Sequence, residues 1–230
     1  MSNSCVITNE EGWYKKALDT DLARPKFAIM NPEITYTLPD YQTQCGCADI
    51  MMHTMERYFV LEDTMEITDK IAQDVMKNVM KYAKILKKDP ENYEARAEIM
   101  WCGSLSHNGL TGCGTCGGDW ATHLIEHELG GMFDVAHGAG LAAVWGSWAR
   151  YVMDEKPERF AQFAVNVMGV KESEDVKSTA LKGIEAVEDF YRMIEMPTNL
   201  KELGIDPTDE QIKDMAMKAT NHDTQQLGAF

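Results

Sequence analysis

The sequence predicts a mainly α-helical domain that follows a short N-terminal segment with β-strand character. From residue 40 onward, apolar residues recur at spacings of three and four, which is the periodicity of amphipathic helices. Before residue 40, apolar runs are short and are interrupted by Pro32 and Pro39. We therefore expect a β-containing segment and connector over residues 1–39 and an all-helical domain over residues 40–230.

The N-terminal segment offers two places for a strand. Residues 1–25 are polar and are expected to be irregular, except that a strand can end near Val6. The apolar run at residues 26–30 predicts a short strand, because the Asn-Pro pair that follows closes it. Residues 33–39 are then expected to form an extended connector.

Eight helices and one short helical turn are predicted beyond residue 39. Pro157 suits a first helical turn, and residues 206–210 have the composition of a helix start. Residues 108–118 contain five glycines and two cysteines and predict a loop whose backbone can approach a ligand closely. The expected helices cover about 40–59, 63–86, 90–107, 119–132, 138–152, 157–167, 173–194 and 208–221, with the turn at 200–204.

Composition excludes several classes of partner. The net charge of -15 argues against nucleic acid and anionic membranes, because both attract basic surfaces. No apolar run reaches the length of a membrane span. The N-terminus lacks the basic start and apolar core of a signal peptide, so we expect a cytoplasmic protein. In that compartment the six cysteines are expected to be plain thiols, since one CxC and one distant CxxC make a weak zinc motif.

Histidines supply the first chemical signal. His123, His127 and His137 lie within fifteen residues, and the first two are four apart, which places them on one face of a helix. Asp49 and His53 are also four apart, on a helix rich in methionine and aromatic residues. A buried carboxylate must be compensated, and a divalent cation such as Fe(II) or Zn(II) does so. A hydrogen-bonded pair at a helix surface is the simpler alternative for these two residues.

A competing motif overlaps the histidine cluster. Residues 123–127 read H-x-x-E-H, a metalloprotease signature. In that interpretation His123 and His127 are both ligands and Glu126 activates water. The pattern is short, and it leaves Asp49, His53 and His137 without a role.

Longer motifs resemble the iron-containing alcohol dehydrogenase family, most of all its butanol dehydrogenase branch. The resemblance extends from Val6 to about Thr220 and is carried by Y-T-L-P at 36–39, C-G-C-A-D-I-M-M-H-T-M-E-R-Y at 45–58 and H-x3-H-x9-H-G at 123–138. It implies the helical metal-binding domain of the dehydroquinate synthase-like/iron alcohol dehydrogenase fold. It also implies that a divalent metal, Fe2+ first and Zn2+ second, is held by four residues, Asp49, His53, His123 and His137.

The resemblance further implies an activity. The family interconverts short-chain aldehydes and primary alcohols with NAD(P)H, and the metal acts as a Lewis acid on the substrate oxygen. His127 would lie beside the nicotinamide and substrate and relay a proton, while Glu126 would have no catalytic role. Trp145, Trp148 and the 108–118 loop are possible pocket walls, although helical spacing favours the two tryptophans as core residues.

One departure from the family pattern limits these expectations. Family members resemble two-domain proteins with an N-terminal α/β dinucleotide-binding domain, of which residues 1–39 are expected to be a remnant. No glycine-rich phosphate loop precedes a helix in this sequence, so no cofactor-binding residue is assigned. The alternative is therefore a truncated or split domain that binds metal but is inactive without a nucleotide-binding partner. The expected partners are a separate nucleotide-binding chain or a second copy in a homo-oligomer.

Overall fold

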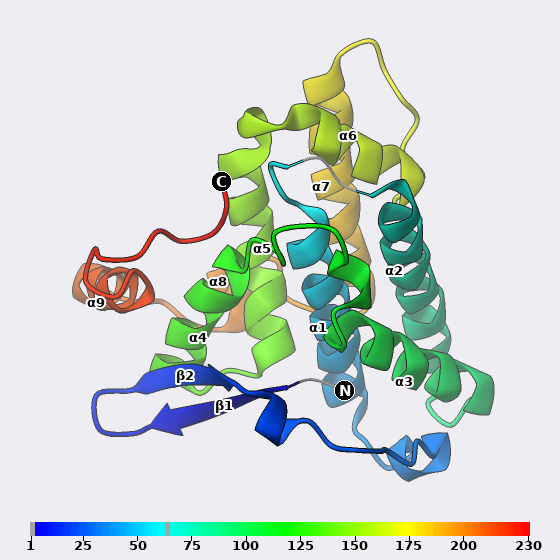
Figure 1. The fold of residues 1–230 in the computed structure, drawn as a ribbon, viewed down its shortest axis with the longest axis horizontal. Coiled ribbons are helices and arrows are strands. Elements are labelled where there is room, and N and C mark those ends of the chain that lie inside the picture. The colour runs from blue at the N-terminus through cyan, green and yellow to red at the C-terminus, as the bar shows by residue number, and fades with distance from the viewer. Residues whose placement is uncertain (1–2, 63–64) are drawn as a thin grey trace.

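The structure, a computed structural model, describes residues 3–62 and 65–230. It is mainly helical, with a two-stranded sheet at the N-terminus (Figure 1). Among the described residues, none of the helices combines the length and apolar character needed to cross a lipid bilayer. In chain order the elements are β1 (Ser4–Asn9), β2 (Tyr14–Asp19), η1 (Asp21–Ala23), η2 (Pro32–Thr35), α1 (Asp40–Tyr58), α2 (Glu66–Leu86), α3 (Tyr93–His107), η3 (Leu110–Gly112), α4 (Ala121–Phe133), α5 (His137–Val152), η4 (Met153–Glu155), α6 (Pro157–Asn166), α7 (Val176–Met193), α8 (Leu200–Leu203) and α9 (Asp209–Ala219).

The N-terminal sheet is an antiparallel hairpin in which Val6 pairs with Ala17. Its second strand lies against α4 (Figure 1). The strand expected at residues 26–30 is wrong: this run is not a strand, and Phe27 and Ile29 are exposed. A strand needs a partner for its backbone hydrogen bonds. Residues 14–19, which the sequence predicted to be irregular, form the strand that pairs with β1.

The helices pack around α1, which contacts α2, α3 and α5 (Figure 1). Met51 and Met55 of α1 are completely buried, and Phe59 just after it stacks on Phe160 of α6 at 4.4 Å between ring centroids. Trp145 and Trp148 of α5 belong to the same cluster. Their interpretation as core residues is therefore confirmed, and the apolar face of α1 fixes this helix in the centre of the domain.

Helix ends follow local capping chemistry more closely than apolar periodicity. The helix expected at 90–107 begins at Tyr93, because the Asn92 side chain accepts the backbone N–H of Ala95. α9 begins after Thr208, which forms a reciprocal capping box with Gln211. The expected start at Asp63 lies outside the described residues, and α2 is described from Glu66.

Candidate metal centre

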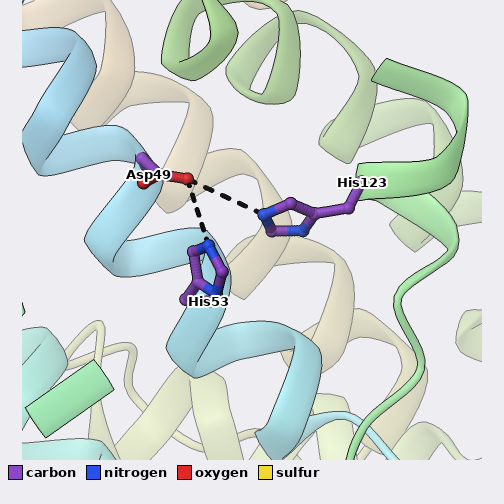
Figure 2. A group of neighbouring side chains, drawn as sticks. All are labelled: Asp49, His53 and His123. Carbon is purple, nitrogen blue, oxygen red and sulfur yellow. Dashed lines mark ion pairs between the residues drawn. The ribbon is translucent and has the colours of Figure 1, made fainter. Parts of the chain in front are cut away.

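Asp49 is the point on which the candidate site converges. α1 places Asp49 and His53 one turn apart, and α4 directs His123 toward the same carboxylate (Figure 2). His137 is the first residue of α5. The next residue, Gly138, brings α5 close to α1, because a Cβ there would lie 2.0 Å from the carbonyl oxygen of Cys45. Glycine is therefore required at the contact that carries His137 to the site.

Three imidazole nitrogens surround one carboxylate oxygen. The distances from Asp49 Oδ1 are 3.5 Å to Nε2 of His53, 3.7 Å to Nε2 of His123 and 3.5 Å to Nε2 of His137. Atoms that bind one tetrahedral ion through bonds of about 2.1 Å lie roughly 3.4 Å from each other. The structure thus places the three expected histidines around Asp49. The ligand atoms of Asp49, His53 and His123 all lie within 4.8 Å of one another, whereas His137 groups with Glu126 and His127.

The unsatisfied atoms of the site also fit a cation. Asp49 Oδ1 and His123 Nε2 are buried and have no hydrogen-bond partner among the described residues. A buried polar atom without a partner is costly, so each one needs an explanation. His123 donates its Nδ1–H to Glu56, so its Nε2 faces Asp49 with either a second proton or a bound cation between them.

Protonation of the first two ligands suits metal binding. Burial opposes the charge of Asp49, but the neighbouring imidazoles, those of His107 and His123 foremost, outweigh it and hold the pKa of this carboxyl well below its usual range. Burial lowers the pKa of His53 to about 2, against the attraction of Asp49. An ionised carboxylate and a neutral imidazole are the forms that bind a divalent cation.

His123 carries the opposite shift. Its burial disfavours the charged ring, but the nearby carboxylates of Asp49 and Glu56 prevail and raise its pKa to about 9. The two surrounding carboxylates therefore attract positive charge to the Nε2 position of His123. A proton or a divalent cation at Nε2 supplies this positive charge.

His127 lies on α4 one turn after His123 but stands apart from Asp49. Its ring centroid is 5.8 Å from that of His137 and 6.5 Å from that of His123. Burial lowers the pKa of His127 to about 4, despite the nearby charge of Glu126. Glu126, His127 and His137 form a second cluster that can hold a metal ion, in contact with the first through His137.

The structure adds one histidine that sequence reasoning missed. His107, at the end of α3, places Nε2 3.4 Å from Asp49 Oδ2, and its ring centroid is 3.8 Å from that of His53. Its Nδ1 contacts the carbonyl oxygen of Gly103 at 2.9 Å. The sequence did contain one indication of this role: His107 directly precedes the glycine-rich loop, residues 108–118, that was expected to approach a ligand.

The H-x-x-E-H interpretation fits the geometry poorly. The side chain of Glu126 is completely buried, and its carboxylate contacts Nδ1 of His137 and, at 3.2 Å, Nζ of Lys15. A catalytic base must reach a water molecule beside the metal, and Glu126 is committed to two other groups.

The cysteines do not extend the site. All six are free thiols, with Cys45 and Cys47 buried in the core and Cys113 and Cys116 exposed. Among the described residues, neither candidate metal cluster includes a cysteine.

Comparison with known proteins agrees with this architecture. Residues 43–229 match the Fe-containing alcohol dehydrogenase family, C-terminal. The chain therefore belongs to the iron-containing alcohol dehydrogenase family, and the resemblance inferred from its motifs is confirmed.

Individual relatives cover the whole chain. It is 34% identical to NADH-dependent butanol dehydrogenase A of Clostridium acetobutylicum, over 100% of this chain and 59% of that protein. It is 33% identical to the NADPH-dependent aldehyde reductase YqhD of Escherichia coli, over 97% and 57%. The crystal structure of NADH-dependent butanol dehydrogenase A from Thermotoga maritima superposes with a TM-score of 0.93, at 35% identity, over 100% and 58%. The chain thus spans less than two thirds of the length of these relatives.

Proposed function

We propose that this chain is the metal-binding catalytic unit of an alcohol dehydrogenase that interconverts short-chain aldehydes and primary alcohols with NAD(P)H. The single observation that carries the proposal is the convergence of three Nε2 atoms on Asp49 Oδ1. Membership of the family and relatives named butanol dehydrogenase and aldehyde reductase support the reaction class.

The proposed ligands are Asp49, His53, His123 and His137, and the proposed ion is Fe2+, with Zn2+ as the alternative. When bound, such an ion supplies Lewis-acid polarisation of a substrate oxygen. Asp49 contributes the negative charge, and His53 contributes a neutral imidazole. His127 borders this set at His137 and is the proposed relay for the substrate proton; burial lowers its pKa, so the ring is neutral.

The nicotinamide cofactor requires a second unit. We assign residues 1–39 to the fringe of a nucleotide-binding domain and residues 40–230 to the metal-binding domain. The named relatives include NADH- and NADPH-dependent enzymes, so both cofactors are candidates. Three buried free thiols, Cys45, Cys47 and Cys102, fit a reducing compartment such as the cytoplasm.

A second candidate function is that of a domain which binds metal but is inactive without a nucleotide-binding partner. Apolar side chains between the hairpin and α1 favour it: Leu22, Phe27, Ile29 and Ile34 are 96%, 81%, 87% and 75% exposed. Apolar surface of this kind marks an interface. The proposed occupant is a nucleotide-binding unit, with a second copy of this chain as the alternative.

One experiment separates these functions. The purified chain is loaded with Fe2+ or Zn2+ without oxygen, its metal content is measured, and NADH or NADPH oxidation is followed with butanal. Metal-dependent turnover that Asp49→Ala abolishes supports the dehydrogenase unit. Bound metal without turnover supports the partner-dependent domain. Absence of bound metal contradicts both, and metal that survives Asp49→Ala but not His127→Ala supports the hydrolase motif.

A further inference from the structure

Two of the proposed ligand histidines contact buried glutamates to which no role has yet been assigned. Glu126 contacts Nδ1 of His137, and Glu56 contacts Nδ1 of His123 at 3.1 Å. Both glutamates are almost completely inaccessible, at 0% and 2% exposure. Burying a carboxylate is costly, and an apolar residue of similar size would fill the same space without that cost. Packing alone therefore does not explain either residue.

The surroundings of Glu126 are shaped to hold it. A Cβ at Gly140 of α5 would lie 2.8 Å from Glu126 Cγ, and a Cβ at Gly130 of α4 would lie 2.6 Å from Lys15 Nζ. Two glycines on two helices thus leave room for one carboxylate and one ammonium group. Lys15 reaches this position from β2 and offsets the charge of Glu126.

Glu56 reaches His123 from the same face of α1 that carries the proposed ligands. Asp49, His53 and Glu56 follow each other at i, i+4 and i+7, which aligns them along one helix face. Glu56 Oε1 accepts hydrogen bonds from both the backbone N–H and the ring Nδ1–H of His123, at 3.0 and 3.1 Å. The start of α4 and the ring of its histidine are therefore fixed by one side chain.

We propose that Glu56 and Glu126 are positioning residues of the metal centre, an inference that rests on the proposed function above. Each carboxylate accepts Nδ1–H from its histidine, which fixes the ring and leaves Nε2 directed at the space beside Asp49 Oδ1. A carboxylate in this position also makes the imidazole a stronger ligand. His53 differs, because its buried Nδ1 has no hydrogen-bond partner among the described residues. His123 and His137 are thus the ligands that the protein holds in advance.

The test compares Glu126→Gln and Glu56→Gln with Glu128→Gln. Glu128 is a matched control, because it is buried on α4 and pairs with the next hairpin lysine, Lys16, but contacts none of the proposed ligands. Affinity for Zn2+ is measured by competition with a chelating indicator. The visible absorption spectrum of the Co2+-saturated chain reports the ligand geometry.

We expect the Glu126 and Glu56 variants to bind Zn2+ on the order of 10–100-fold more weakly than wild type. Their Co2+ spectra should change, while Glu128→Gln keeps both properties. A spectral change at full Co2+ occupancy is not produced by a loss of fold stability alone. Glu126→Asp, which retains the charge, should recover part of the affinity.

Wild-type affinity and an unchanged Co2+ spectrum in both glutamine variants would overturn the positioning role. That failure is distinguishable from failure of the proposed function. If the wild-type chain binds neither Zn2+ nor Co2+, or if Asp49→Ala binds both as tightly, the metal centre itself is wrong.

Discussion

The helices that carry the proposed ligands and the N-terminal segment, residues 3–39, differ in how they bury their side chains. α1 buries its apolar face and directs Asp49 and His53, which are partly exposed, into a cluster of polar groups. The stretch between the hairpin and α1 leaves Phe27 and Ile29 largely exposed. Burial fixes the site in the helical domain, whereas apolar side chains of the N-terminal segment stay exposed.

The two regions meet at a pair of lysines. Lys15 of β2 contacts the buried Glu126, and Lys16 lies 3.8 Å from Glu128. Lys218 of α9 donates a hydrogen bond to the carbonyl oxygen of Gly12 in the hairpin turn. The hairpin is therefore anchored to the helical domain by charge and contributes one group to the surroundings of His137.

The largest expected effect concerns the ligand set. Asp49→Ala removes its one carboxylate and the atom that the three Nε2 atoms share. We expect affinity for Zn2+ to fall by more than about 10³-fold, roughly 4 kcal/mol. Isothermal titration calorimetry measures this loss. His127→Ala is the control, since that ring lies outside the set around Asp49, and equal loss in both variants would contradict the assignment.

The next prediction contrasts packing in the two regions. Phe59→Ala removes a completely buried ring that stacks on Phe160, so unfolding free energy should fall by about 3–5 kcal/mol. Phe27→Ala removes an exposed ring and should change it by less than about 0.5 kcal/mol. Urea unfolding followed by circular dichroism compares the two. A large loss for Phe27→Ala would show that the N-terminal segment packs against the domain in solution.

The smallest expected effect concerns Lys15 and Lys16, the two lysines that link the hairpin to α4. Lys15→Met leaves the buried Glu126 without its ammonium partner and should cost about 1–3 kcal/mol of stability. Lys16→Met should cost less than about 0.5 kcal/mol, because Lys16 is largely exposed and its ion pair is long. Thermal unfolding of the metal-free variants measures both. Equal effects would mean that burial of Glu126 does not depend on Lys15.

Local spacing explains what the sequence predicted well. Asp49 with His53, and His123 with His127, are four apart, and a helix places such pairs on one face wherever it packs. The segments that became α1, α4 and α5 could be recognised for the same reason. Assignment of His137 to the ligand set and of His127 to the substrate side rested on family resemblance, because spacing alone left both open.

Long-range contacts explain what the sequence did not reveal. His107 reaches Asp49 only because α3 packs on α1, and Lys15 reaches Glu126 only because β2 lies against α4. The strand at residues 14–19 was missed since its partner, β1, supplies the hydrogen bonds that stabilise it. The positioning role proposed for Glu126 also depends on space left by Gly140, which no local pattern encodes.

The central claim is that one divalent cation lies between Asp49 and three histidines. Anomalous diffraction from crystals of the chain grown with Zn2+ or Co2+ tests it most directly, because the signal locates the ion independently of the protein atoms. We predict a single strong peak within bonding distance of Asp49 Oδ1 and of Nε2 in His53, His123 and His137. A peak bound instead by Glu126 and His127, or no peak at this cluster in metal-saturated crystals, would contradict the account.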